Sequence, residues 1–278
     1  MGGGVLDQFR LDGKVAIITG GAGFLGVQHA QAVMAGGGIP VIVDIDRERT
    51  FRTAGDLEGE FHGDALGLGG DVTDKRSMEK VLMQVLDRYD RVDILINNAA
   101  HDPKVSSEPG GIPWTRFEAF PEDAWERDLA VGLKGAFICS QVIGAEMERR
   151  NRGVILNISS DLGIIAPDQR IYRREGLPDR EQPVKPISYS VVKHGLIGLT
   201  RYLATYWADR GIRVNALCPG GMYRDQSPEF VERLSGLIPM GRMASLGEYR
   251  AVVLFLISDA SSYMTGSTVI VDGGRTCW

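Results

Sequence analysis

The strongest constraint on the fold is the alternation of short apolar runs with longer amphipathic segments. Seven runs have the length of strands: residues 14–19, 39–44, 65–71, 92–98, 153–159, 212–218 and 267–273. Their apolar residues are consecutive, which is typical of parallel strands buried on both faces. Strand–helix alternation over short links favours right-handed crossovers. The sequence therefore predicts an α/β fold, a doubly wound seven-stranded parallel sheet with helices on both faces.

Two segments interrupt this alternation within one predicted domain, residues 1–278. Residues 101–120 follow the fourth apolar run and residues 166–187 follow the fifth, and both are rich in Pro, Gly and charged residues. Both therefore leave the carboxyl ends of strands, where open α/β sheets bind ligands. We expect them to cover a substrate; the alternative is that they are tolerated surface insertions.

Composition excludes several classes of function. The formal net charge of −5 argues against a nucleic-acid partner. Cys139, Cys218 and Cys277 are widely spaced and predict free thiols in a reducing cytoplasm. No apolar run approaches the ~20 residues that span a bilayer, so no membrane association is expected. No cluster of His, Asp and Glu suggests a metal site.

The stretch "TGGAGFLG" follows the first apolar run and opens a helix-like segment. Glycines there let the backbone approach a pyrophosphate, and the helix N-terminus supplies N–H groups and a favourable dipole. Gly20 suits the tight turn, Gly23 the close approach and Gly26 the packing of helix on sheet. With Phe24 and Leu25, these residues form the predicted phosphate loop of a Rossmann-type dinucleotide site.

An acidic residue ends the second apolar run, where the adenosine ribose of a dinucleotide would lie. A carboxylate at Asp44 accepts hydrogen bonds from both ribose hydroxyls and repels a 2′-phosphate, so NAD is the expected cofactor. NADP is the alternative, because Arg47 or Arg49 in the following "DIDRER" is able to meet a phosphate.

Further motifs stand in a characteristic order: "GDVTD" (70–74), "INNAA" (96–100), the Ser160, Tyr189 and Lys193 pattern, and "CPGG" (218–221). Over residues 10–274 the chain resembles the short-chain dehydrogenase/reductase family. One departure is Phe24, because the family's middle glycine usually stands there, and a glycine at position 23 is commoner in nucleotide-sugar epimerases and dehydratases. The resemblance implies cofactor contacts at Asp71, Val72, Asn98, Ala99, Pro219, Gly220 and Met222.

The same resemblance gives the catalytic residues. Tyr189 and Lys193 stand four residues apart, so a helix places both on one face. A nearby ammonium lowers the pKa of a tyrosine from its ordinary ~10, and tyrosinate accepts a proton from an alcohol as hydride leaves. Lys193 is also expected to hold the nicotinamide ribose. Ser160, with Gly163 three residues later, is expected to orient the substrate oxygen, whereas Ser159 is interpreted as a strand-end hydroxyl that satisfies backbone.

A second departure affects the catalytic machinery. The family usually carries an asparagine in the helix before the fifth strand, where it anchors a water that links the lysine to solvent, but "VGLKG" places Gly132 there. Either a water or another polar group fills the gap, or proton relay is slower. His101, directly after "NNAA", is a candidate substrate contact.

The substrate is predicted to be a small molecule, a polar sugar or sugar derivative, either neutral or anionic. Cations in "QRIYRR" and at Lys185 suit an anion, and Trp114 or Tyr172 can stack on a sugar ring. Nearby acids almost balance the cations, so the alternative is a solvated, self-paired loop. The loop sequences "CPGGMYRDQSPEF" and "VDGGRTCW" are similar to dehydrogenases of bacterial sugar pathways, including legionaminic-type precursor synthesis.

Three functions are compatible with these motifs. The leading hypothesis is an NAD-dependent alcohol/carbonyl oxidoreductase. The second is a nucleotide-sugar epimerase or dehydratase with tightly bound NAD, although the chain lacks the C-terminal substrate domain typical of those enzymes. The third is a non-catalytic NAD-binding protein, which retention of the Ser, Tyr and Lys residues disfavours. The family resemblance also implies a homo-oligomer, a tetramer or dimer, through helices 121–150 and 188–210.

Overall fold

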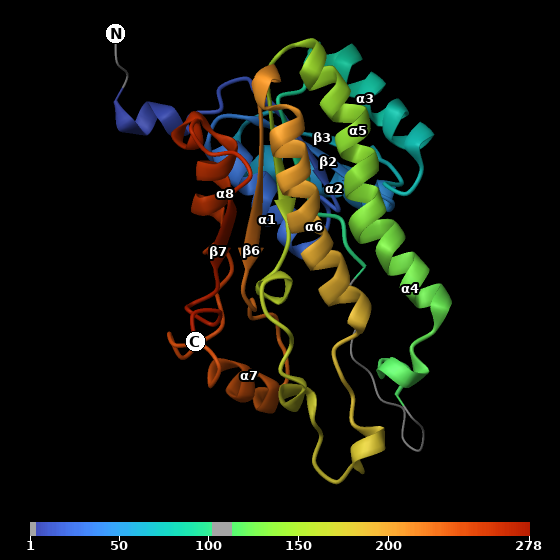
Figure 1. The fold of residues 1–278 in the computed structure, drawn as a ribbon. Helices are drawn as coiled ribbons and strands as arrows, with labels where there is room; N and C mark the ends of the chain where they lie inside the picture. Colours follow the sequence, from blue (N-terminus) through green and yellow to red (C-terminus); the bar gives the residue numbers. More distant parts are fainter. Residues whose placement is uncertain (1–3, 102–112) are drawn as a thin grey trace.

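A seven-stranded parallel sheet separates two layers of helices (Figure 1). The computed structural model describes residues 4–101 and 113–278. The strand order is β3-β2-β1-β4-β5-β6-β7, with every neighbouring pair parallel. The strands are β1 (Val15–Thr19), β2 (Ile39–Asp44), β3 (Leu66–Gly69), β4 (Ile94–Asn97), β5 (Gly153–Ile158), β6 (Ile212–Pro219) and β7 (Thr268–Val271). The predicted α/β fold is therefore confirmed.

The central strands are buried on both faces, which explains their consecutive apolar residues. Ile17 of β1 packs into the core beneath helices α3, α5 and α6, whereas its neighbour Ile18 packs into the core beneath α1, α2 and α8. The helices are α1 (Phe24–Ala35), α2 (Arg47–Phe61), α3 (Lys75–Tyr89), α4 (Glu122–Leu129), α5 (Gly135–Arg149), α6 (Ile187–Tyr206), α7 (Pro228–Ser235) and α8 (Arg250–Ile257).

Helices α4 and α5 form one continuous helix, joined by a π-helical turn over Ala130–Lys134. This helix was predicted over residues 121–150. Among the described residues it alone has the length and apolarity of a membrane span, but more than half of its most apolar stretch is buried inside the protein. Its apolar residues belong to the core shared with α3, α6 and the sheet, so its apolarity is explained by packing.

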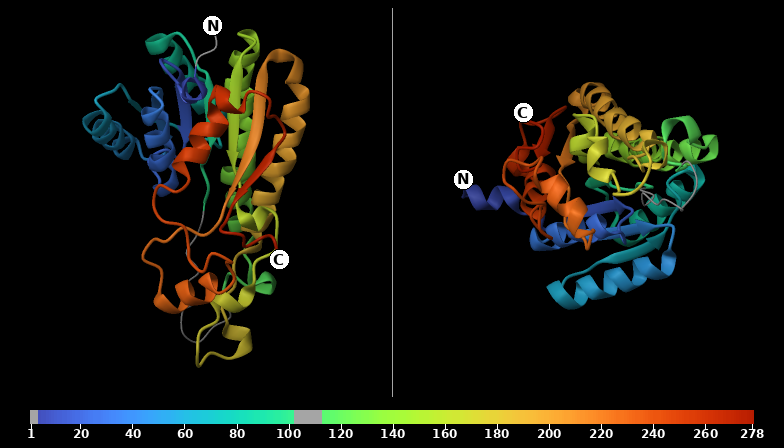
Figure 2. Two further views of the ribbon diagram at one scale, coloured as in Figure 1. Left: turned by 90° about the vertical axis from the view of Figure 1, so that its left-hand side faces the viewer. Right: turned by 90° about the horizontal axis from the view of Figure 1, so that it is seen from below.

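The carboxyl end of the sheet carries the irregular segments. The insertion 166–187 packs against α7, and a small apolar cluster of Ile171, Leu234, Ile238 and Met243 joins them. Figures 1 and 2 show the insertion, in yellow, and α7, in orange, beyond the same end of the sheet. That this insertion covers a substrate stays a prediction. Residues 102–112 of the other predicted loop lie outside the described residues.

Candidate active site

The glycine loop has the geometry of a phosphate cradle. Gly20 has a φ of +59°, a left-handed conformation that other residues rarely adopt, and a Cβ on it would lie 2.9 Å from the Cα of Ala99. A Cβ on Gly26 would overlap the carbonyl oxygen of Gly20. Gly23 precedes α1 and has no side chain with which to cap it, so the first N–H groups of the helix are available to an anion. These features fit a dinucleotide pyrophosphate.

Phe24 and Leu25 begin α1 directly after this cradle. The guanidinium of Arg224, from the segment after β6, lies 4.6 Å from the centroid of the Phe24 ring. The residue that replaces the expected glycine therefore makes a cation–π contact with the segment after β6. Neither the position nor the partner of Arg224 was predicted from the sequence.

Asn98 and Ala99 hold the glycine loop through Thr19. The Asn98 amide Nδ2 donates to the carbonyl oxygens of Thr19 and Gly20, at 3.0 and 3.1 Å. The Thr19 hydroxyl oxygen accepts from the backbone N–H groups of Asn98 and Ala99, at 3.0 and 3.1 Å. Both residues thus lie against the cradle, and Thr19, which the sequence analysis did not select, is the residue that joins them to it.

Two acidic residues lie at and just after the end of β2. Asp44 ends β2 and is half-buried, and its carboxylate accepts the backbone N–H of Asp46 at 3.3 Å. Asp46 is exposed and caps α2. The guanidinium of Arg47 lies over the ring of Phe51 on its own helix, 5.2 Å from the centroid. Asp44 is consequently the half-buried acid at the end of β2, and its contact with a ribose stays a prediction.

Asp71 and Val72 follow β3 at the same end of the sheet. One carboxylate oxygen of Asp71 accepts from both the backbone N–H and the hydroxyl of Thr73, at 2.8 and 2.7 Å. Val72 is buried and packs closely on Gly135, since a Cβ on Gly135 would lie 2.8 Å from a methyl carbon of Val72. The carboxylate is thus held by its own turn, and Val72 joins this turn to α5.

The turn after β6 lies at the same carboxyl end of the sheet. Pro219 ends β6, and Gly220 accepts a hydrogen bond of 2.9 Å from the buried Tyr249 hydroxyl. Burial is the main cause that raises the pKa of Tyr249, so this hydroxyl stays a donor. Met222 makes an isolated bridge to Ala244. The turn is fixed by contacts on both sides.

Tyr189 and Lys193 lie on the first turns of α6, beside the end of β5. The Lys193 ammonium is buried, donates to the carbonyl oxygen of Ile158 at 2.9 Å and lies 5.6 Å from the centroid of the Tyr189 ring. A second ammonium, that of Lys185 in the insertion, lies 3.8 Å from the same centroid. The tyrosine is therefore flanked by two cations, of which only Lys193 was assigned to it from the sequence.

The two serines after β5 make different contacts. The Ser159 hydroxyl donates to the backbone carbonyl of Lys193 at 2.8 Å, so it satisfies backbone, as expected. The Ser160 hydroxyl donates to the Asp161 carboxylate at 2.8 Å. The other oxygen of that carboxylate accepts from the Arg275 guanidinium at 2.6 Å, and this ion pair is buried. Neither Asp161 nor Arg275 was selected from the sequence.

Gly132 lies in the π-helical turn and has a packing explanation. A Cβ on Gly132 would lie 2.6 Å from a methyl of the buried Val192 on α6. Because real Cβ contacts are never that short, the helices approach too closely here for an asparagine. A nearby polar group does exist one helical turn earlier, at Asp128 on α4.

Asp128 connects three elements. Its buried carboxylate lies 2.5 Å from Nδ1 of His101, and it also accepts a hydrogen bond from the Ser188 hydroxyl at the start of α6. Among the described residues the partner of His101 is Asp128, and its contact with a substrate stays a prediction.

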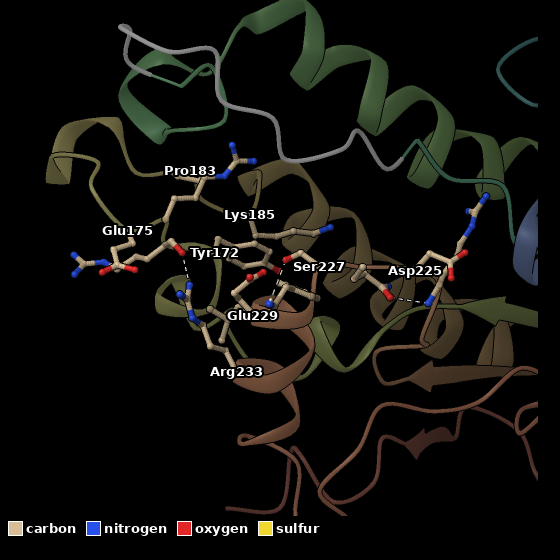
Figure 3. A pocket seen from close by; sticks show the side chains of 14 residues that line it. Tyr172, Glu175, Pro183, Lys185, Asp225, Ser227, Glu229 and Arg233 are labelled. Carbon is tan, nitrogen blue, oxygen red and sulfur yellow. Dashed lines mark hydrogen bonds between the residues drawn. The ribbon is translucent and has the colours of Figure 1, made fainter.

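A cavity of about 1060 Å³ opens between the insertion and the segment around α7 (Figure 3). Its lining includes Arg173, Arg174, Lys185, Arg224 and Arg233, together with the acids Glu175, Asp225 and Glu229. Tyr172 lines it and packs on Phe230, with ring centroids 5.6 Å apart. Trp114, the other predicted stacking residue, instead stacks on Phe120.

Part of the predicted self-pairing of the insertion is present. Arg170 makes a bidentate ion pair with Asp168, and Arg173 pairs with Asp179 at 3.0 Å. These cations are neutralised within the loop. Within residues 4–101 and 113–278, no group of three or more His, Cys, Asp and Glu side chains is placed to hold a metal ion.

Comparisons with known proteins decide the family. The model of the short chain dehydrogenase family matches residues 14–172, and the model described as enoyl-(acyl carrier protein) reductase matches residues 179–276. The chain belongs to the short-chain dehydrogenase family. Two curated relatives are each 31% identical over 97% of the chain: the NAD-dependent glycerol dehydrogenase of Listeria innocua (96% of it covered) and the D-threitol dehydrogenase of Mycolicibacterium smegmatis (95%).

A solved short-chain dehydrogenase shares the fold closely. The gluconate 5-dehydrogenase of Burkholderia cenocepacia, in complex with NADP and tartrate, is 28% identical, with a TM-score of 0.85 over 99% of this chain and 100% of its own. One of these relatives is therefore described with NAD and another with NADP. The family membership establishes a nicotinamide-dependent oxidoreductase, and the comparisons leave the choice between the two cofactors to the residues of the site.

Proposed function

We propose that the protein oxidises a secondary alcohol of a polyol or sugar-derived substrate with NAD, and catalyses the reverse reduction. The observation that supports this proposal is the Tyr189 ring, which lies near the ammonium groups of both Lys193 and Lys185, because Lys185 also lines the large cavity. NAD, when bound, accepts a hydride from the alcohol carbon. Tyr189 takes the hydroxyl proton, Lys193 stabilises the tyrosinate, and Ser160 hydrogen-bonds the substrate, so that a ketone and neutral tyrosine result.

The names of the relatives support a polyol. Glycerol and threitol are small polyhydroxylated alcohols, and these relatives are matched over nearly their whole length. The resemblance to legionaminic-type precursor enzymes has no support from the comparisons, and we replace it with the polyol class. NAD is the proposed cofactor because Asp44 presents a carboxylate where NADP would carry a phosphate.

We further propose that the substrate has an acidic end. The cavity lining contains five cations and three acids, so positively charged side chains outnumber negatively charged ones there. Arginine binds carboxylate or phosphate bidentately. An aldonate is then expected to have a lower KM than the neutral polyol of the same length, and Arg224→Met should reduce that difference.

The proposed assembly is a homo-oligomer that works in the cytoplasm. Cys139 and Cys218 are buried free thiols and Cys277 is an exposed one. Burial raises the pKa of the Cys139 thiol to about 12, so this cysteine is a packing residue without nucleophilic character. Three thiols without a disulfide are typical of a reducing compartment.

The experiment compares wild-type protein with Tyr189→Phe. Formation of NADH is measured with NAD or NADP against polyols, aldonates and simple secondary alcohols, and cofactor binding is measured by titration. Net NADH formation in wild type, lost in Tyr189→Phe while the cofactor still binds, is the expected result. Undiminished turnover by Tyr189→Phe would refute the catalytic assignment, and preference for a plain aliphatic or steroidal alcohol would refute the polyol class.

A further inference from the structure

Of the two ammonium groups beside the Tyr189 ring, the nearer one comes from the insertion 166–187. The Lys185 ammonium lies 3.8 Å from the ring centroid, whereas the Lys193 ammonium lies 5.6 Å from it. A cation over the face of an aromatic ring is attracted to the ring electrons. The attraction is stronger for a tyrosinate, because its negative charge spreads into the ring, and an opposite charge within ~4–6 Å favours the ionised form of an acid.

The insertion fixes where Lys185 stands. The backbone N–H of Lys185 donates to the side-chain oxygen of Gln169 at 2.8 Å. Pro186, the residue directly before α6, follows Lys185, and a proline restricts the residue before it to an extended backbone. Figure 3 shows the Lys185 side chain among those that line the large cavity. One segment therefore lines this cavity and places an ammonium over the ring of Tyr189.

Other charged groups beside the first turns of α6 have partners of their own or are exposed. Asp161, from the segment after β5, faces Arg275 at 2.6 Å, and both side chains are buried. The buried carboxylate of Asp128, from α4, lies 2.5 Å from Nδ1 of His101. Each carboxylate thus has a partner other than the tyrosine. The exposed groups are Lys134 and His194.

We propose that Lys185 is a second cationic partner of Tyr189, through which the insertion lowers the pH at which this tyrosine acts as a base. Lys185 acts through Tyr189 and transfers no proton itself. Removal of its charge destabilises the tyrosinate more than the neutral tyrosine, so alcohol oxidation then needs a higher pH for the same rate. This inference rests on the proposed alcohol oxidation and deepens it, because the segment that lines the large cavity also sets the basicity of Tyr189.

The first measurement needs no substrate. Ionised tyrosine absorbs at a longer wavelength than neutral tyrosine, so an absorbance titration of each protein is compared with that of the same protein carrying Tyr189→Phe. The wild-type difference should have its midpoint below the ordinary ~10 of tyrosine. Lys185→Met should raise this midpoint by about one pH unit, and Lys185→Gln should give the same shift. Lys185→Arg keeps a cation that stacks on aromatic faces, so it should retain the wild-type midpoint.

The second measurement is the pH profile of kcat/KM, which reports ionisations of the free enzyme. It uses NAD and whichever of glycerol and threitol wild type oxidises faster. The acidic limb should move to higher pH by about one unit in Lys185→Met, so that kcat/KM below the limb falls about tenfold and recovers at high pH. A purely structural defect would instead lower kcat/KM at every pH.

Arg170→Met is the matched control, because it removes one positive charge from the same insertion. Its guanidinium pairs with Asp168 at 2.6 Å, and its side chain is 81% exposed. The tyrosine midpoint of this variant should equal that of wild type. An unchanged midpoint in Lys185→Met, an equal shift in Arg170→Met, or a shift in Lys185→Arg as large as in Lys185→Met would overturn the proposal.

The two measurements separate this inference from the proposed function. If the tyrosine midpoint shifts as expected but wild type oxidises no alcohol, the proposed function fails and the coupling of Lys185 to Tyr189 stands. If wild type oxidises a polyol and neither the midpoint nor the acidic limb responds to Lys185→Met, the function stands and this inference is overturned.

Discussion

At the residue scale, a buried histidine makes stability depend on pH. His29 on α1 is 1% exposed, and neither ring nitrogen makes a well-formed hydrogen bond with a described residue. Burial lowers the pKa of His29 to about 4, and a weak interaction with the Asn98 side chain opposes this shift. The histidine therefore remains neutral in the fold at pH values where the unfolded chain is already protonated.

The direction of the effect follows from proton linkage. The unfolded state binds a proton as pH falls through about 6.5 and the folded state only near 4, so the free energy of unfolding falls as pH falls across this window. The loss is about 3 kcal/mol, from roughly 1.4 kcal/mol for each pKa unit. The free energy of unfolding, measured with urea at pH 7, 5.5 and 4.5, should fall less with falling pH in His29→Leu than in wild type. His194→Gln, on an exposed part of α6, should show the same fall as wild type. Equal slopes for wild type and His29→Leu would contradict the prediction.

A second residue-scale prediction concerns cofactor choice. Asp44→Asn keeps the shape of the side chain but removes the charge that repels a 2′-phosphate. We expect the ratio of kcat/KM for NADP over NAD to rise about tenfold, with a parallel change in binding affinity measured by titration. Asp46→Asn, two residues later, is the control, because Asp46 is exposed and caps α2. A wild-type enzyme that prefers NADP would show that the carboxylate does not set the choice.

At the scale of elements, the close approach of the π-helical turn to α6 explains the missing asparagine. Gly132→Ala would ordinarily stabilise a helix by about 1 kcal/mol. Here the new methyl would lie 2.6 Å from a methyl of Val192, so the expected result is a loss of about 1–3 kcal/mol in the free energy of unfolding. Val192→Ala should relieve the clash. A double-mutant cycle measured by urea unfolding will give the coupling free energy between positions 132 and 192. If the effects of the two single substitutions simply add, the contact with Val192 does not explain why position 132 holds a glycine.

The elements were predictable because their signals are local. Consecutive apolar residues indicate a strand that is buried on both faces. Gly20 and Gly26 indicate a single turn whose backbone other atoms approach closely. The positions of Asp161 and Arg275 carry no such signal, since they are 114 residues apart and meet only because β5 and β7 end on the same edge of the sheet. The reason for Gly132 is equally non-local, because Val192 belongs to another helix.

At the scale of the whole molecule, the exposed aromatic residues of α5 and α6 favour the predicted oligomer. Phe137, Tyr202 and Tyr206 are 50%, 65% and 59% exposed, and the two tyrosine rings stack with centroids 6.0 Å apart. Aromatic residues are enriched at the centres of protein interfaces, and a stable one buries about 800 Å² on each partner. The helices 121–150 and 188–210 are those that the family resemblance assigns to assembly.

We therefore expect wild type to sediment as a dimer or tetramer at micromolar concentration. Tyr202→Glu places a charge in the centre of the proposed face and should lower the apparent mass, because an unpaired charge is costly to desolvate when two copies meet. Tyr263→Glu is the control, since Tyr263 is fully exposed in the turn before β7, outside α5 and α6. A monomeric wild type, or an oligomer that tolerates Tyr202→Glu, would move the assembly surface away from α5 and α6. Measurement of turnover across the same concentration range would then show whether the active site needs the assembled form.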